Sequence, residues 1–174
     1  RVVDKVEIIN NLIQEEDVVV TLTHSGYIKR ISADTYSSQR RGGRGIQAMS
    51  TKEDDFVEHL FVSSTHDYIL FFTTAGRVFK LKAYDLPEAS RTAKGTAIVN
   101  LLQLEQEEKI AAVIPVNDFS KDKYVLMATK NGLVKKTSLD EYTNIRKTGI
   151  LGITLKEDDE IIDATKRYLQ DTDE

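Results

Sequence analysis

The feature that most constrains the fold is a hairpin-like segment that occurs three times along the chain. Residues 17–30, 67–80 and 123–136 each contain two short runs of β-branched or aromatic residues around a Ser-Gly, Ala-Gly or Asn-Gly pair. Such runs around a glycine turn are typical of β-hairpins, and Asn131-Gly132 in the third copy predicts a type I′ turn. The sequence therefore predicts three antiparallel hairpins as its basic units.

Two further landmarks follow each hairpin. The turn glycines Gly26, Gly76 and Gly132 are 50 and 56 residues apart, and a second glycine lies 17 to 19 residues after each of them. A short apolar stretch follows the second glycine, and an acidic stretch then leads into another apolar run. Four strands in about fifty residues are typical of a propeller blade, so the sequence predicts an all-β protein.

We expect one repeat domain over residues 1–174, with blades at about 17–66, 67–122 and 123–166. Propellers ordinarily close with about four to eight blades. Three blades therefore indicate an open arc or a piece of a larger ring. Helical periodicity is weak throughout the chain, and its best candidate is the stretch Lys166–Gln170.

Composition places the chain among ordinary folded proteins. Hydrophobic residues make up 40% and charged residues 30% of the chain, which argues against intrinsic disorder. The lack of cysteine excludes disulfides and thiolate metal sites, and it fits a reducing cytoplasm. The apolar runs are too short to span a bilayer and no signal peptide opens the chain, so we expect no membrane partner.

Basic residues are concentrated in the same part of every repeat, although the formal net charge is −4. Residues 24–52, 76–95 and 130–149 hold 16 of the 24 Lys and Arg side chains and carry net charges of +5, +3 and +3. Equivalent positions of blades related by rotation lie on one rim, and a basic rim suits binding and bending of duplex DNA through its phosphates. Scattered surface charge is the alternative, but it would not place basic residues at equivalent positions of successive repeats. We call such a set of equivalent positions a column.

The densest basic segment reads Gln39-Arg40-Arg41-Gly42-Gly43-Arg44-Gly45. Guanidinium groups match phosphate oxygens in pairs, and glycine allows the backbone to lie against a polyanion. A solvated, flexible turn has the same composition. The segment by itself therefore leaves both interpretations open.

This segment resembles the gyrase-A box, the hallmark of the C-terminal DNA-wrapping domain of bacterial DNA gyrase A. Residues 20–30, 76–82, 91–95 and 144–146 are similar to blades of the same family. The resemblance covers essentially the whole chain. It implies a six-bladed β-pinwheel, a propeller variant in which neighbouring blades exchange strands, of which this chain would be about three blades beginning with the one that carries the box.

The resemblance implies sequence-tolerant binding, bending and wrapping of duplex DNA, in support of negative supercoiling by DNA gyrase, an ATP-hydrolysing type II topoisomerase. It implies phosphate contacts from Arg40, Arg41 and Arg44 of the box, with its glycines shaping the loop. The repeat columns add a set of rim positions that we expect to contact DNA. These are Lys29, Arg30, Arg77, Lys80, Arg91, Lys94, Lys135, Lys136, Arg146 and Lys147.

Strand cleavage is expected elsewhere. In the family the nucleophilic tyrosine, the Mg²⁺ carboxylates and the ATP site lie in other domains or in the partner protein of the gyrase complex, so the resemblance implies a non-catalytic piece without cofactor or metal. Tyr36 and Tyr142 share a column with Leu86 and are interpreted as packing residues.

The remaining candidates for chemistry are weak. His24, His59 and His66 lack metal-ligand spacing, and the acidic run 157–160 resembles a solvated blade junction. The implied partners are duplex DNA, the remainder of DNA gyrase A and the DNA gyrase B protein, in the bacterial cytoplasm at the nucleoid. A protein-interaction propeller and the equivalent domain of topoisomerase IV, where the box is usually degraded, remain as alternatives. A small propeller enzyme would need convergent titratable groups that the sequence lacks.

Overall fold

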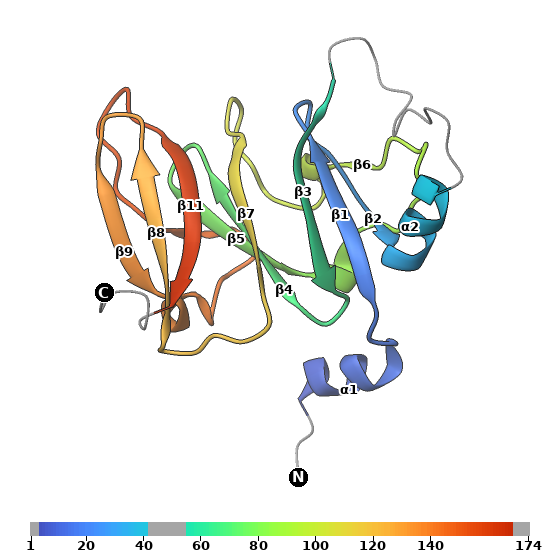
Figure 1. Ribbon diagram of the computed structural model, residues 1–174. Coiled ribbons are helices and arrows are strands. Elements are labelled where there is room, and N and C mark those ends of the chain that lie inside the picture. Colours follow the sequence, from blue (N-terminus) through green and yellow to red (C-terminus); the bar gives the residue numbers. More distant parts are fainter. Residues whose placement is uncertain (1–3, 42–54, 169–174) are drawn as a thin grey trace. The chain divides into compact units, whose positions relative to one another are not determined.

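The computed structural model describes residues 4–41 and 55–168 of the chain (Figure 1). The chain folds into two compact units, which are described separately. Unit 1 comprises Arg1–Asp67 and Lys82–Ile98, and unit 2 comprises Tyr68–Leu81 and Val99–Glu174. The second repeat is thus divided, because its hairpin lies in unit 2 up to Leu81 and the segment after it lies in unit 1. The expected blade limits stay a prediction.

Unit 1 is built on a four-stranded antiparallel sheet in the order β3-β1-β2-β6. Its strands are β1 (Asp17–Thr23), β2 (Tyr27–Ser32), β3 (Val57–Ser64) and β6 (Thr96–Ala97). Six consecutive residues of β1 are buried, so both faces of this strand are covered. Strand β6 belongs to the second repeat but pairs with β2 of the first, with Tyr27 opposite Ala97 and Ile28 opposite Thr96.

Unit 2 contains two antiparallel sheets, β10-β5-β4-β7 and β11-β8-β9. Their strands are β4 (Tyr68–Thr73), β5 (Arg77–Lys82), β7 (Ile110–Val116), β8 (Lys123–Thr129), β9 (Val134–Ser138), β10 (Ile150–Leu151) and β11 (Ile161–Tyr168). Strand β10 comes from the third repeat and pairs with β5 of the second. The two-residue strands β6 and β10 thus each complete the sheet of the preceding repeat. The predicted all-β class is confirmed.

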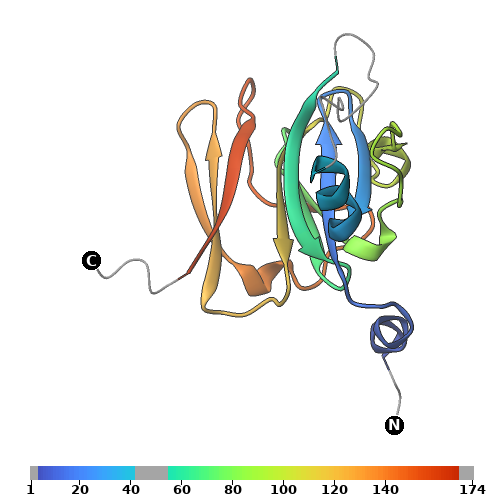
Figure 2. The same ribbon diagram turned by 45° about the vertical axis from the view of Figure 1, so that its right-hand side comes forward.

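Two helices were not predicted from the sequence. Helix α1 (Lys5–Leu12) begins after Asp4, whose carboxylate accepts a hydrogen bond from the Val6 amide at 3.1 Å. Helix α2 (Ala33–Arg41) follows β2 and packs against β1 and β2 (Figure 2). Both are short, and α2 is mostly polar, so neither has the long apolar stripe that identifies a helix. Three 3₁₀ helices also occur, η1 (Ala83–Asp85), η2 (Ile98–Asn100) and η3 (Leu139–Tyr142).

The helix predicted at Lys166–Gln170 is wrong over its described part. Strand β11 continues through Tyr168 and pairs with β8, with Lys166 opposite Val125 and Tyr168 opposite Lys123. Residues 169 and 170 lie outside the described residues. Pairing with a neighbouring strand outweighs a weak local preference for helix.

The three hairpin turns share one geometry, and it is not type I′. Gly26, Gly76 and Gly132 have φ angles of 91°, 85° and 92°, whereas no other residue of these turns has a positive φ. A type I′ turn needs positive φ at both central residues. In the third turn Ala128 lies opposite Val134, and the Gly132 amide donates to the Thr129 carbonyl, so the turn is a longer one that ends on a left-handed glycine.

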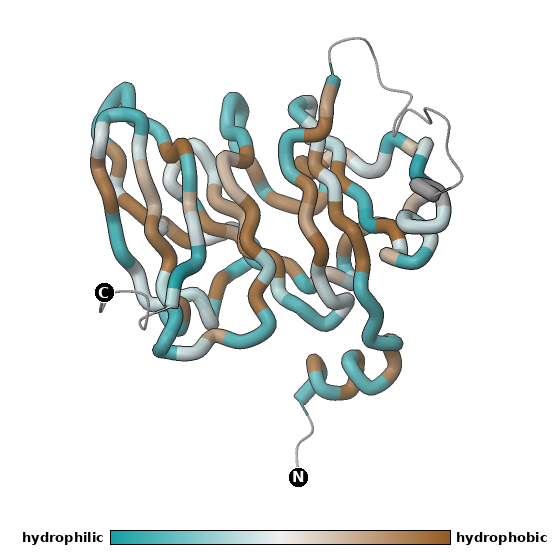
Figure 3. Tube along the Cα trace, viewed as in Figure 1, coloured by the Kyte–Doolittle hydropathy of each residue, from teal (hydrophilic) through white to brown (hydrophobic). Residues whose placement is uncertain are grey.

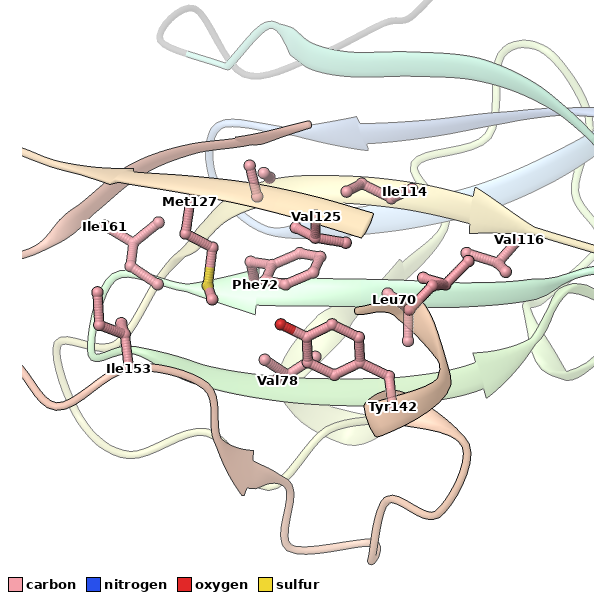
Figure 4. Packing of buried hydrophobic residues seen from close by; sticks show 13 residues of the cluster. Leu70, Phe72, Val78, Ile114, Val116, Val125, Met127, Tyr142, Ile153 and Ile161 are labelled. Carbon is pink, nitrogen blue, oxygen red and sulfur yellow. The ribbon is translucent and has the colours of Figure 1, made fainter. Parts of the chain in front are cut away.

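The core of unit 2 lies between its two sheets (Figure 4). Phe72 and Tyr142 meet edge to face, with ring centroids 5.9 Å apart, beside Val78 and Met127. Tyr142 is only 1% exposed, like its column partner Leu86, which confirms the packing role predicted for Tyr142, whereas Tyr36 is only partly buried. Hydrophobic residues follow the strands in both units, and hydrophilic residues collect at the turns (Figure 3).

Candidate nucleic-acid interface

The gyrase-A-box segment is only partly within the described residues. Gln39, Arg40 and Arg41 form the end of α2, and nothing is described of their side chains. The remaining positions Gly42, Gly43, Arg44 and Gly45 lie outside the described residues. The box therefore stays a prediction, attached to the end of a helix that packs on the first hairpin.

Lys29 does not lie on a surface. Its side chain starts in β2 and is only 2% exposed. The ammonium donates hydrogen bonds to the carbonyls of Ser90, Arg91 and Ala93 at 3.0, 2.6 and 2.8 Å. Burial, and then the positive charge of Arg91, lower the pKa of Lys29 below its usual value. An ammonium has three donors, so none remains for a phosphate, and we remove Lys29 from the set of rim contacts.

The segment held by Lys29 carries two other predicted rim residues. The Lys94 side chain is exposed, and its ammonium lies 4.0 Å from the centroid of the Tyr27 ring. The Arg91 guanidinium lies 5.1 Å from the Tyr36 ring of α2, and its Nε and Nη1 atoms are buried without a hydrogen-bond partner. The structure therefore places Arg91 and Lys94 each on an aromatic ring of the first repeat.

Arg30, the next residue of β2, is partly buried. Its Nε donates to the Leu86 carbonyl at 2.8 Å, and its backbone amide donates to the Pro87 carbonyl at 2.9 Å. Its own carbonyl accepts from the Ala89 amide. Arg30 thus secures the approach to the same segment, and only part of its guanidinium group remains for a phosphate.

The guanidinium group of Arg77 is bound by other residues of unit 2. Its guanidinium pairs with Glu108 through Nε at 3.0 Å and Nη2 at 2.5 Å, and it also donates to the carbonyls of Gln103 and Thr148. Glu108 is only 2% exposed. Hydrogen bonds to Glu108 raise the pKa of Arg77 above its usual value. Because four of its five donors are used, Arg77 is a structural ion pair in this geometry rather than a phosphate contact.

Lys80 is also engaged by its own unit. Its ammonium donates to the Thr143 carbonyl at 2.5 Å and lies 4.9 Å from the Tyr68 ring and 5.3 Å from the Phe119 ring. The side chain is partly buried. We therefore place it among the residues that secure the third repeat's segment against the second repeat's hairpin.

The third repeat exposes its basic residues most. Lys135 donates to the Gly152 carbonyl at 2.9 Å, and Lys136 lies 4.3 Å from the Tyr124 ring, yet both are exposed on β9. Arg146 and Lys147 are exposed at the turn before Gly149. These positions match the sequence prediction of surface cations, and their contact with DNA stays a prediction.

A set of acids that was not predicted from the sequence binds the hairpin turns. Asp55 accepts from the Ser25 amide at 2.9 Å, and Asp159 accepts from the Asn131 amide at 3.0 Å. Glu108 takes the matching place in the second repeat, accepting the Thr73 hydroxyl at 2.5 Å. The sequence predicts a solvated blade junction for the acidic run 157–160, and the regular occurrence of acids after each hairpin is the signal that could have revealed this role.

The surroundings of these acids favour their charged form. Burial alone raises the pKa of Glu108, but hydrogen bonds from Arg77 and Thr73 outweigh it and hold the pKa below its usual value. For Asp55 and Asp159 the same balance holds, since burial raises the pKa and hydrogen bonds from the turn amides lower it by more. These three acids are therefore engaged at the hairpin turns, and exposed cations occur in the basic windows.

Within residues 4–41 and 55–168, no group of three or more acidic or His side chains could hold a metal ion. His24 pairs with Glu58 at 2.5 Å and stacks on Phe56, and His66 contacts the Ile13 carbonyl at 2.7 Å. In the same ranges, no helix is both long and apolar enough to cross a membrane.

A family model described as "DNA gyrase C-terminal domain, beta-propeller" matches residues 17–64, 67–117 and 123–166. These three segments take up most of the chain, and each begins with the first strand of a hairpin. The chain belongs to the DNA gyrase C-terminal domain family. The resemblance identified in the sequence is thereby confirmed.

Individual relatives agree with this family. DNA gyrase A of Clostridium acetobutylicum is 62% identical over 154 residues, which cover 88% of this chain and 19% of that protein. The chain thus spans about a fifth of the length of this curated relative. Among solved structures, the C-terminal domain of DNA topoisomerase IV matches with a TM-score of 0.74 at 34% identity, covering 88% of this chain and 46% of that one.

The solved C-terminal domain of DNA gyrase A matches with a TM-score of 0.68 at 26% identity, covering 88% of this chain and 48% of that one. Fold comparison alone therefore leaves both paralogues open. The higher sequence identity to DNA gyrase A favours the gyrase family over topoisomerase IV. Membership also accounts for the exchange of β6 and β10 between repeats.

Proposed function

We propose that this chain binds duplex DNA with little regard to sequence, and that together with the rest of DNA gyrase A it bends and wraps DNA in support of negative supercoiling by DNA gyrase. The observation that carries the proposal is the placement of its charges. Exposed cations recur after the hairpin turns, at Lys94 in unit 1 and at Lys136, Arg146 and Lys147 in unit 2. The family membership supplies the setting.

The charge balance fits phosphate binding despite the net charge of −4. Asp55 and Asp159 accept hydrogen bonds from amides of the hairpin turns, and Glu108 is paired with Arg77, so these three acids are engaged within their own repeats. Cations held on aromatic rings keep their charge and lose little freedom when they meet a phosphate. Each phosphate neutralised contributes about 0.9 to the slope of log affinity against log salt.

The box adds the densest positive charge. In this proposal Arg40, Arg41 and Arg44 contact phosphates at the end of α2, where the glycines allow close approach of a backbone to the duplex. Strand cleavage, ATP and Mg²⁺ belong to other parts of gyrase, and this piece acts with the rest of DNA gyrase A and with DNA gyrase B in the bacterial cytoplasm. Its own contribution is binding rather than catalysis.

Binding to a linear duplex over a salt series tests the proposal. Changing Arg40, Arg41 and Arg44 together to Ala should weaken binding and reduce the salt slope by about 2.7, three times the contribution of one phosphate. The matched control changes Lys109, Lys121 and Lys156 to Ala, which removes the same charge from exposed positions outside the basic windows. Equal slopes for the two triple variants would show that position is irrelevant and would refute the box assignment.

Wrapping is tested separately from binding. Nicked circles ligated in the presence of the protein trap a change in linking number if DNA is wrapped. Since the chain has only three of the repeats, we expect it to bind without trapping a shift. A positive shift would instead show that three repeats wrap DNA by themselves.

A further inference from the structure

The contacts of Lys29 suggest a role that differs from phosphate binding. Its ammonium is enclosed by the carbonyls of Ser90, Arg91 and Ala93, which lie 61 to 64 residues further along the chain. The turn that presents these carbonyls is closed by a hydrogen bond from the Ala93 amide to the Ser90 carbonyl at 3.2 Å. A single side chain of the first repeat thus satisfies three backbone acceptors of the second.

Directly after these carbonyls, residues 95–97 lie against strand β2. Gly95 has a φ of +90°, and a Cβ atom there would lie 2.5 Å from the Ile28 carbonyl oxygen. Thr96 and Ala97 then pair with β2, and the Ile98 amide donates to the Gly26 carbonyl at 2.7 Å. The Lys29 contacts, the glycine and the short strand together fix residues 90–98 on the first hairpin.

The equivalent position of the second repeat supports an anchoring role for this column. Three residues after its turn glycine stands Phe79, which is 1% exposed. A Cβ atom at Gly149, on the segment that enters from the third repeat, would lie 2.9 Å from the Phe79 ring. A buried cation in one repeat and a buried ring in the next therefore meet the incoming segment at the same place.

We propose that Lys29 is a positioning residue for the DNA-binding edge of unit 1: it holds residues 90–94 so that Lys94 and the Nη2 end of Arg91, whose Nε and Nη1 atoms are buried, meet phosphate, and it makes no phosphate contact itself. This inference rests on the proposed function. The two cations flank the anchored carbonyls in sequence, and each lies on an aromatic ring of the first repeat, Tyr36 for Arg91 and Tyr27 for Lys94. Releasing the segment would remove both from their places.

A cycle of variants separates positioning from direct contact. Duplex binding is measured over a salt series for the parent, Lys29→Met, the double variant Arg91→Ala/Lys94→Ala, and the three changes combined. We expect Lys29→Met to reduce the slope by about as much as the double variant, about 1.8, with nothing further lost in the combination. A direct phosphate contact would instead reduce the slope by about 0.9 alone and by a further 0.9 in the combination.

Lys135→Met provides the matched control. Lys135 is the third-repeat member of the column, but it is exposed and donates only to Gly152. Its loss should add fully to that of Arg91→Ala/Lys94→Ala. If Lys135→Met and Lys29→Met were equally non-additive with Arg91→Ala/Lys94→Ala in their salt slopes, the assignment would be overturned. The non-additivity would then follow from the loss of any lysine in this column and not from the anchoring by Lys29.

Amide hydrogen exchange tests the anchor without DNA. Lys29→Met should raise exchange at Ile98 at least about tenfold while leaving Val20 in the buried strand β1 protected. If Lys29→Met fails to fold, Gly95→Ala releases the same segment sterically and should give the same slope loss, again without addition to the double variant. Unchanged exchange at Ile98 overturns the anchor, whereas failure of the parent to bind DNA overturns the proposed function and leaves the exchange result valid.

Discussion

The β2-β6 junction of unit 1 and the β5-β10 junction of unit 2 are built on one backbone plan with different chemistry. Both accept a two-residue strand from the following repeat beside a hairpin closed by a left-handed glycine. At the position three residues after that glycine, unit 1 uses the ammonium of Lys29 and unit 2 the ring of Phe79. The backbone therefore fixes which column faces the incoming segment, and the individual repeat selects polar or aromatic anchoring.

This difference explains why charge columns alone overstate the proposed DNA-binding surface. Backbone carbonyls occupy the donors of a lysine in an inward-facing column, as at Lys29. An ion pair occupies the donors of an arginine beside a buried acid, as at Arg77. Lys94 and Lys136 instead lie exposed on tyrosine rings. Exposure, more than residue type, separates structural cations from candidates for phosphate contact.

The largest expected effect concerns the aromatic junction. Phe79→Ala should destabilise the fold by about 3 to 5 kcal/mol, because it removes a buried ring and leaves a cavity against the incoming segment. Chemical denaturation followed by tyrosine fluorescence measures this, since the chain has 7 Tyr and no Trp. Phe56→Ala is the control, because Phe56 is 55% exposed and should cost far less. Equal losses would mean that Phe79 does not anchor the junction.

The ion pair of unit 2 should give the next largest effect. Glu108→Gln keeps the shape of the side chain but removes the charge that faces Arg77, and we expect a loss of about 1.5 to 3 kcal/mol. Denaturation of Glu108→Gln, Arg77→Met and the double variant should show strong coupling between the two positions. Simple additivity of the single losses would contradict the pairing as a determinant of stability.

The turn acids predict instability in acid. Asp55, Glu108 and Asp159 have lowered pKa values in the folded chain, so they stabilise it fully above their unfolded values near about 4. That stability is lost as the pH falls through the folded values. An acid titration of the Glu108→Gln variant should show a weaker dependence on pH in this range than the parent. An identical dependence would show that Glu108 does not carry this linkage.

The exposed cations should have the smallest effect on folding. Lys94→Met and Lys136→Met each remove a cation from a tyrosine ring, so we expect a loss of no more than about 1 kcal/mol of stability. Each should still reduce the salt slope of duplex binding by about 0.9. A large loss of stability with an unchanged slope would place these residues with Lys29 and Arg77 as structural cations.

Much of the fold could be predicted because it is encoded locally and repeatedly. The three hairpins follow from strand runs around glycines, and the repeat length indicates blades. The turn type was missed because Asn-Gly suggested a two-residue loop. A threonine recurs at the start of each longer turn, and its hydroxyl accepts a hydrogen bond from the amide four residues later. The pairs are Thr23 with Tyr27, Thr73 with Arg77 and Thr129 with Leu133.

The candidate site was predicted less completely because side-chain burial depends on the partner segment. Alternation along β2 places Lys29 and Arg30 on opposite faces, but the carbonyls that surround Lys29 come from residues 90–93. The sequence did hold one signal: the column of Lys29 contains Phe79, and an apolar member indicates an inward-facing position. The Arg77 pair with Glu108 had only the recurrence of acids after each hairpin as a signal, because the acid lies 31 residues away and nothing local marks the arginine that it meets.

That exposed cations of the basic windows contact DNA phosphates is tested by the salt dependence of duplex binding. The variant for this measurement has Lys94, Lys136, Arg146 and Lys147 all changed to Ala. The comparison uses two linear duplexes of unrelated sequence and the control triple variant at Lys109, Lys121 and Lys156. We expect the four exposed cations together to contribute about 3.6 to the slope, equally on both duplexes, and the control variant to retain the parent slope. A parent slope in the quadruple variant, or binding that depends on the duplex sequence, would contradict it.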